Sequence, residues 1–122
     1  MKTVLVVDSD LGFVAFISKA LSQAGYVALP ATESQTALPL LGELNNPQVD
    51  LLMVNFDLPG TADLARALME RNESLKIIAI QGLGASATTH IPVHAGLRKP
   101  SLGELTAEGE WIKTVKQVLG EG

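Results

Sequence analysis

Residues 51–60 read Leu-Leu-Met-Val-Asn-Phe-Asp-Leu-Pro-Gly, and this stretch decides the fold. Four consecutive apolar residues ended by polar and turn-forming ones are typical of a short strand covered on both faces, as in a parallel sheet. Two further runs of this kind lie at residues 4–7 and 77–80. The chain is therefore expected to build a buried parallel sheet.

Segments with helical spacing of apolar residues separate these strands. We expect helices over residues 11–23, 34–44 and 61–71, and a last one that starts after Thr106. The third should bury Leu64, Ala67 and Leu68. Residues 26–29 and 97–100 are expected to supply the two remaining strands. This alternation of strand and helix predicts right-handed crossovers and helices on both faces of the sheet.

Several residues are expected to set the limits of these elements. Gly25 should terminate the first helix, and Pro30 should end the second strand. Ser34 and Thr106 are expected to be N-caps, and Pro39 should lie near the first turns of its helix or bend it.

Composition excludes several classes of protein. The chain has 122 residues, 47% of them hydrophobic and 18% charged, with a net charge of −4 and no cysteine. These values fit one compact domain over residues 1–122 and exclude disorder, disulfides and zinc–cysteine sites. An acidic balance offers no general attraction to nucleic acid or to an anionic membrane. We therefore expect a soluble, cytoplasmic domain.

Polar residues follow the strands at the edge where such sheets bind ligands. In doubly wound sheets that edge is formed by the carboxyl ends of the strands. Asp8, Asn55, Gln81 and Lys99 stand at those ends in this chain.

These strand ends resemble those of bacterial response-regulator receiver domains. The resemblance rests on Val-Val-Asp-x-Asp at residues 6–10, on the segment from Asp50 to Gly60, and on Lys99-Pro100. It implies a CheY-like, flavodoxin-like α/β fold: a doubly wound five-stranded parallel sheet in three α/β/α layers. In that family an acidic pair binds Mg²⁺, an aspartate after the third strand accepts phosphate, and a hydroxyl and a lysine end strands four and five.

Carried over residue by residue, most of that chemistry is missing. Asp8 matches the first acid, but Ser9 stands at the second position, and Asn55 replaces the phosphoacceptor. A carboxamide has no anionic oxygen and cannot act as the carboxylate nucleophile. Asp57 matches a position that lends a backbone carbonyl to the metal, and Gln81 replaces the switch hydroxyl.

The remaining family positions are mixed. Gly96 stands where an aromatic switch residue is usual, whereas Lys99 and Pro100 are retained, the latter with a possible cis peptide. We expect Lys99 to pair with Asp8 as a structural contact, a residual anion or partner contact being the alternative. Asp10 is expected to cap the first helix.

Three other features have simple structural explanations. Residues 82–86 are expected to form a plain loop rather than an anion-binding nest. His90 and His94 are separated by Pro92, which disfavours a metal site. Trp111 is expected to anchor the last helix in the core, with an interface role as the alternative.

The interval from Gln81 to Lys99 is about one helical turn shorter than the resemblance implies. It is rich in glycine, threonine and proline, so we expect the fourth helix to be short, distorted or missing. The receiver face made by helix four, strand five and helix five should be remodelled accordingly.

The sequence thus indicates an atypical receiver of a two-component or phosphorelay system that works without phosphorylation, as a protein-interaction module and not as an enzyme. Its partner is expected to be another signalling protein, a second receiver or a second copy, bound through the helix 4–strand 5–helix 5 face. No cofactor or resident metal is expected, and Mg²⁺ binding should be weak or absent. The alternatives are a genuine Mg²⁺-dependent phosphoreceiver switched by a histidine kinase and, more remotely, a flavodoxin-like cofactor binder. The latter is disfavoured because Asp8 and Asp10 would repel a phosphate group.

Overall fold

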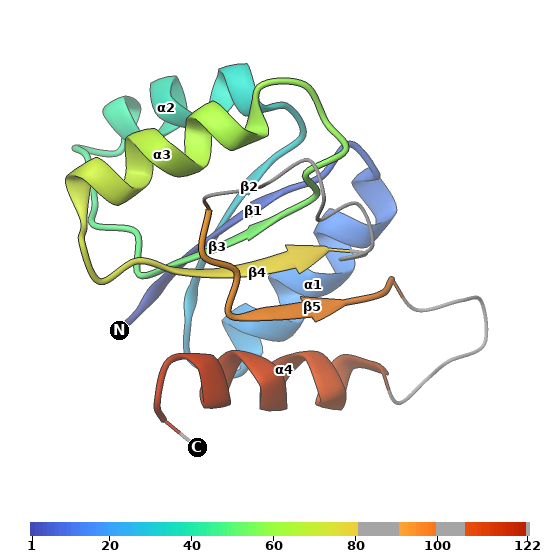
Figure 1. Cartoon of the computed structure of the whole chain (residues 1–122). Coiled ribbons are helices and arrows are strands. Elements are labelled where there is room, and N and C mark those ends of the chain that lie inside the picture. Colours follow the sequence, from blue (N-terminus) through green and yellow to red (C-terminus); the bar gives the residue numbers. More distant parts are fainter. Residues whose placement is uncertain (81–90, 100–106, 122) are drawn as a thin grey trace.

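The computed structural model describes residues 1–80, 91–99 and 107–121 (Figure 1). Within these residues the chain forms nine elements in the following order: β1 (Thr3–Val7), α1 (Leu11–Gln23), β2 (Val27–Ala31), α2 (Ser34–Glu43), β3 (Leu51–Val54), α3 (Thr61–Arg71), β4 (Lys76–Ile80), β5 (Ala95–Leu97) and α4 (Ala107–Val118).

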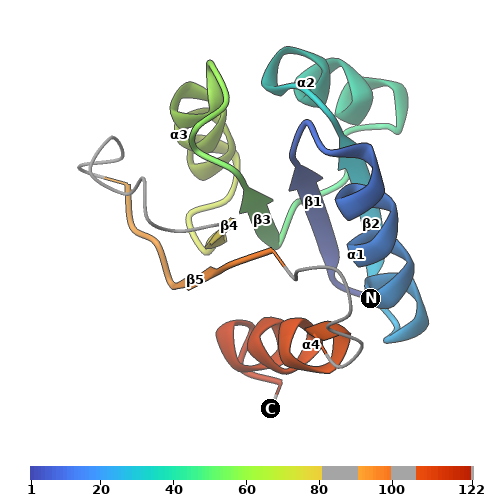
Figure 2. The ribbon, with the colours of Figure 1, turned by 90° about the vertical axis from the view of Figure 1, so that its right-hand side faces the viewer.

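The five strands form one parallel sheet in the order β2-β1-β3-β4-β5. Helices α1 and α4 cover one face, and α2 and α3 cover the other (Figures 1 and 2). The strand order reverses between β1 and β3, so the carboxyl ends of these two strands flank the switch point. The CheY-like doubly wound fold predicted from the sequence is confirmed.

The sheet divides the hydrophobic core into two halves. Val4 and Val6 of β1 pack with the α1–α4 side, whereas Leu5 and Val7 pack with the α2–α3 side. All four residues are completely buried. Because successive side chains of a strand point to opposite faces, only a strand covered on both faces reads as a continuous apolar run.

Helix α1 begins and ends as its sequence predicts. The Asp10 carboxylate accepts a hydrogen bond from the Phe13 backbone N–H at 3.1 Å, which confirms Asp10 as the N-cap. At the other end Gly25 has a φ of 96°, and the Tyr26 N–H donates to the Leu21 carbonyl at 3.0 Å. This arrangement is the Schellman ending that glycine favours.

Strand β2 does not end at Pro30 as predicted; it continues to Ala31. The Val27 N–H donates to the Lys2 carbonyl and the Ala31 carbonyl accepts from Asp8, so alternate residues of β2 face β1. Pro30 falls between them, so its backbone nitrogen and carbonyl point away from β1. On this side β2 has no neighbouring strand, because it lies at the edge of the sheet. There the missing N–H removes no ladder hydrogen bond.

Ser34 does not cap α2, so the N-cap prediction for this residue was wrong. Glu33 is the N-cap residue, and it makes no side-chain capping bond. The Ser34 hydroxyl instead donates to the Pro59 carbonyl at 2.6 Å. Gly60 beside it has a φ of 78°, and a Cβ at that position would lie 2.7 Å from the Ser34 Oγ. Ser34 therefore fastens the β3–α3 connection to α2.

Pro39 lies inside α2, near its first turns as predicted. A proline there leaves the carbonyl four residues earlier without its helical N–H partner. In α3 the buried residues are Thr61, Leu64, Ala65 and Leu68. Ala65 is therefore buried where the sequence pattern predicted Ala67.

The last helix is anchored as expected. Trp111 is 1% exposed and packs in the α1–α4 half of the core, which confirms the core assignment. After the helix, Glu121 accepts a hydrogen bond from the Tyr26 hydroxyl at 2.6 Å. Burial, together with this bond and the Glu121 charge, raises the pKa of Tyr26 to about 12. The proposed cap Thr106 lies outside the described residues.

The entry to β5 differs from the prediction. The strand covers Ala95–Leu97 and not residues 97–100, because its pairing with β4 starts at Ala95 opposite Ile78. His94 prolongs that pairing: its N–H donates to the Ile77 carbonyl at 2.8 Å, and its Nδ1 accepts from the Ile77 N–H at 3.0 Å. His94 thus acts as a backbone partner.

The expected short or missing fourth helix falls mainly on residues 81–90, which lie outside the described part of the chain, as do His90 and the loop at residues 82–86. Residues 91–94, which are described, are not helical. Among the described residues, no helix is both long and apolar enough to cross a bilayer.

Candidate functional site

Three polar side chains meet at the carboxyl edge of the sheet. Asp8 follows β1, Asn55 follows β3 and Lys99 follows β5. The Asn55 N–H donates to the Val7 carbonyl at 3.0 Å, which continues the β1–β3 pairing and sets Asn55 beside Asp8. Asp8 and Asn55, which are 47 positions apart in the chain, are thereby brought into contact.

Asp8 is the centre of this cluster. Its side chain is completely buried, which requires compensation for its charge. The Asp8 Oδ1 accepts from the Lys99 Nζ at 2.9 Å and from the Asp10 N–H at 2.9 Å. The Asp8 Oδ2 accepts from the Asn55 Nδ2 at 3.4 Å. The expected pairing of Lys99 with Asp8 is present, and every contact delivers a donor to the carboxylate.

Lys99 also contacts Asp10 and Phe13, which the sequence analysis did not predict as its partners. Its side chain is 19% exposed, and Nζ lies 3.7 Å from the Asp10 Oδ2 and 5.5 Å from the centre of the Phe13 ring. The Phe13 ring in turn lies 5.2 Å from Trp111, at 60° to it. Cation–π attraction adds to the ion pair. In the sequence Phe13 is one of several apolar residues of α1, so nothing indicated that its ring would lie next to Lys99.

Asn55 is half-buried, and both ends of its carboxamide are engaged. Its nitrogen donates to Asp8, and its Oδ1 accepts from the Asp57 N–H at 2.9 Å. An aspartate would offer the second of these bonds but not the first, because an ionised carboxylate has no donor. The amide therefore fits this site as a structural bridge between the β1 and β3 ends, and it lacks a nucleophilic oxygen.

The other predicted site residues make weaker contributions. The Ser9 and Asp57 side chains are exposed, and neither approaches Asp8 through a side-chain hydrogen bond in the described part of the chain. Gly96 lies in β5 opposite Ala79. Gln81 and Pro100 lie outside the described residues.

The side chains at this edge do not fit a magnesium ion. Mg²⁺ needs near-octahedral oxygen ligands, usually with one or two carboxylates among them. Asp8, which is a buried carboxylate, already has a lysine ammonium at hydrogen-bond distance, and the Asp10 Oδ1 is used to cap α1. Asn55 turns its nitrogen toward Asp8. Within the described ranges, no three acidic, histidine or cysteine side chains are grouped as metal ligands.

The fold and this edge can be compared with known proteins. A response regulator receiver protein from Burkholderia phymatum superposes with a TM-score of 0.77 and 23% identity, over 100% of this chain and 98% of the other. A putative response regulator from Chloroflexus aurantiacus gives 0.73 and 24%, covering 98% of both chains. A CheY-like receiver domain protein from Methanospirillum hungatei gives 0.75 and 20%, over 99% of this chain and 95% of that one.

No protein-family profile and no curated sequence matches this chain. At the identities found, the likeness to solved structures establishes the fold, which is that of response-regulator receiver domains. What the domain does with that fold depends on the residues at its carboxyl edge.

Proposed function

We propose that this chain is an atypical receiver domain of a two-component or phosphorelay system, and that it acts without phosphorylation as a protein-interaction module. The observation that carries the proposal is Asn55 at the end of β3. Its carboxamide bridges Asp8 and the Asp57 backbone where a receiver needs a free carboxylate. The domain is accordingly proposed to have no catalytic activity.

The contacts of Lys99 support the same conclusion. In a phosphorylated receiver, cations neutralise a newly added phosphate. Here the ammonium group already neutralises Asp8 at 2.9 Å and lies over the Phe13 ring. Side-chain contacts thus join the ends of β1, β3 and β5. The domain is proposed to hold one fixed state and to act in the cytoplasm.

We propose the β5–α4 side as the surface that meets a partner, either another signalling protein, a second receiver or a second copy. β5 is an edge strand, and Val93 just before it is 37% exposed. On α4 the partly exposed Ile112 lies beside the exposed Lys113 and Lys116. This combination favours a partner with an acidic rim and an apolar centre.

The proposal is tested by incubation with acetyl phosphate and Mg²⁺, followed by intact-mass measurement. The wild-type domain should stay unmodified because Asn55 offers no ionisable oxygen. A phosphate increment on the Asn55 peptide of the wild type would overturn the proposal and establish the alternative, a genuine phosphoreceiver.

Restoring the missing acids provides a matched positive control. Asn55→Asp alone should label slowly at best, because Ser9 still denies the ion a second carboxylate. Adding Ser9→Asp should increase labelling by more than the sum of the single changes, since both acids share one ion. Rapid labelling of Asn55→Asp alone would show that the second acid matters little here.

A separate measurement addresses the partner surface. Lys113→Glu should weaken association with a second copy or with a receiver from the same host, as followed by sedimentation. Lys19→Glu changes the charge equally on the exposed side of α1 and should have no effect. Equal behaviour of the two variants would argue against the β5–α4 surface.

A further inference from the structure

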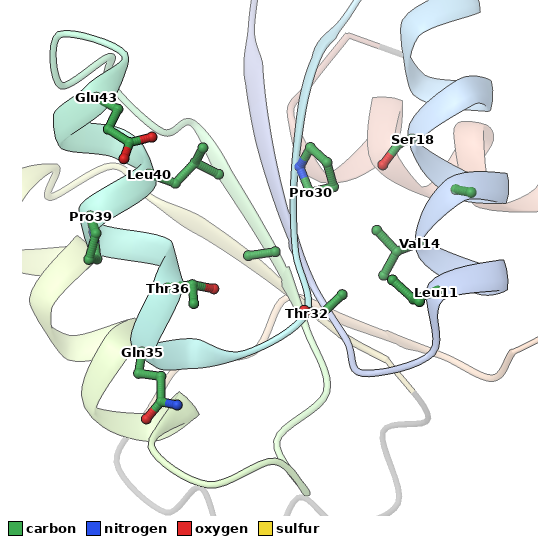
Figure 3. Close-up of a pocket in the computed structure, with 12 residues that line it drawn as sticks. Leu11, Val14, Ser18, Pro30, Thr32, Gln35, Thr36, Pro39, Leu40 and Glu43 are labelled. Carbon is green, nitrogen blue, oxygen red and sulfur yellow. The ribbon is translucent and has the colours of Figure 1, made fainter.

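A second surface feature lies along β2, the edge strand on the side of the sheet opposite to β5. Between α1 and α2, over the edge strand β2, a groove of about 660 Å³ opens to solvent (Figure 3). Its wall on α1 is formed by Leu11, Val14, Ala15 and Ser18. We call this feature the β2-edge groove.

The wall on the other side belongs to α2. Figure 3 shows Gln35, Thr36, Pro39, Leu40 and Glu43 along that helix, facing the α1 side chains across Pro30 and Thr32. The residues of each wall recur at spacings of three and four, so each helix offers one continuous stripe to the groove. Most of the lining side chains are apolar or small.

The α1 wall exposes apolar surface that the fold itself does not use. Leu11 is 71% exposed, and Ala15 beside it is also exposed, whereas the core stripe of α1 runs through other positions. An exposed large apolar residue at the mouth of a groove is a common feature of binding surfaces. The apolar lining therefore favours an occupant with apolar side chains.

A polar group in the same wall lacks a partner. The Ser18 Oγ is buried, and it makes no hydrogen bond within the described part of the chain. A serine inside a helix commonly bonds back to the carbonyl four residues earlier, but Ser18 does not. In Figure 3 the Ser18 side chain lies on the side of α1 that faces Pro30.

The backbone at the floor argues against an added strand as the occupant. Pro30 directs its backbone outward from the sheet, and proline has no N–H to donate. A proline at this place is a recognised protection against edge-to-edge pairing. Recognition in the groove must then come from side chains, which favours a helix lying between α1 and α2.

In a second copy of this chain, the most exposed large apolar side chains of the described residues do not lie together on one helix. The large apolar residues exposed there are Met1, Leu11, Leu44 and Val93. No two of them lie on one helix face, because Leu11 starts α1 and Leu44 follows α2. We therefore take a partner protein as the occupant, and a second copy is an alternative that the test below can reveal.

The charge of the groove indicates which kind of helix fits. Among the described residues that line the groove, Glu43 is the only charged one, and the exposed Glu33 precedes the same helix. A basic residue of the occupant would complement Glu43 at the α2 end. We infer that the β2-edge groove binds an amphipathic helix of a partner protein, with leucine-like side chains against α1 and a lysine or arginine toward Glu43.

This inference does not rest on the proposed function, because the groove is present whether or not residue 55 can be phosphorylated. The probe is a synthetic peptide of about 14 residues, with leucines at helical spacing and lysines on the other face. Binding is measured by fluorescence anisotropy and located by amide chemical-shift changes. A peptide of the same composition with the leucines scattered around the helix is the control ligand.

Two pairs of variants test the two parts of the groove. Ala15→Glu places a charge on the apolar wall and should weaken binding by about tenfold or more, whereas Ser22→Glu, exposed on the same helix outside the groove, should not. Glu43→Lys should weaken binding by about two- to fivefold, an effect that salt reduces, while Glu70→Lys on α3 should not. Unfolding curves establish that each variant is folded.

Chemical-shift changes confined to residues of α1, β2 and α2, together with both variant effects, support the inference. Equal losses in Glu43→Lys and Glu70→Lys would reveal general charge attraction and overturn it. Equal binding of the scattered control peptide, shifts at the β5–α4 side, or full binding by Ala15→Glu would also overturn it.

Discussion

Asn55→Asp is the substitution that distinguishes most sharply between the proposed phosphorylation-independent domain and a working phosphoreceiver. In the wild type the Asn55 Nδ2 lies 3.4 Å from the Asp8 Oδ2. An aspartate replaces this donor with a second negative oxygen. At that separation and an effective dielectric of about 20, the repulsion is about 5 kcal/mol before screening.

The net cost should be smaller, because Lys99 lies 2.9 Å from Asp8 and residue 55 is only half-buried. We expect Asn55→Asp to lower the free energy of unfolding by about 2 kcal/mol in chelator, or the midpoint temperature by about 8 °C. Mg²⁺ at tenfold its dissociation constant should restore about 1.4 kcal/mol, because it binds only the folded state. The wild type should not respond to Mg²⁺.

The assay is a set of thermal melts with chelator and with millimolar Mg²⁺. Gln48→Glu is the matched control, because it also turns an amide beside a carboxylate, Asp50, into an acid, but at an exposed site. That variant should lose less than about 0.5 kcal/mol and show no rescue by Mg²⁺. A wild-type midpoint raised several degrees by Mg²⁺ would refute the reasoning, since the edge would then hold a metal despite Asn55 and Lys99.

Three further outcomes are expected. Lys99→Met should lower the free energy of unfolding by about 2–4 kcal/mol, because it leaves Asp8 buried without its cation. Adding Asp8→Asn should recover most of that loss, as measured by urea unfolding. Full additivity of the two changes would contradict this coupling. Gly60→Ala should lower the free energy of unfolding by about 1–3 kcal/mol, because of the positive φ and the close Ser34 hydroxyl. Adding Ser34→Ala should remove the steric part of this loss, which a double-mutant cycle would reveal. The pKa of Tyr26 is raised above its unfolded value, so its contribution to the free energy of unfolding is complete below pH 10 and is lost as the pH rises toward 12. Over that range the wild type should lose about 1–3 kcal/mol more stability than Tyr26→Phe. Parallel curves of stability against pH for the two proteins would refute this.

Local patterns in the sequence determined much of the fold. The runs at residues 4–7 and 51–54 can be apolar throughout only in strands covered on both faces, and the structure buries them completely. Asp10 and Gly25 set the ends of α1 through bonds to residues close by in the chain. Such features are predictable because the groups that decide them are sequence neighbours.

The predictions that were wrong concern residues whose partners are distant in the chain. Ser34 has the chemistry of an N-cap, but its hydroxyl donates to Pro59, which only the packing of α2 against the β3–α3 connection brings near. Pro30 was expected to end β2, yet the edge position of that strand allows it to continue. Which strand lies at the edge is decided by the order of the whole sheet.

The candidate site divides in the same way. The sequence by itself determined that residue 55 is an amide, that residue 9 is not an acid, and that an aspartate and a lysine end β1 and β5. Only the tertiary structure decided that the Lys99 ammonium lies on Asp8 and over Phe13, and that Asn55 turns its nitrogen toward the same carboxylate. The chemistry of a side chain is fixed by its residue type, whereas its partner is fixed by the parallel sheet, which brings the ends of β1, β3 and β5 together from positions far apart in the chain.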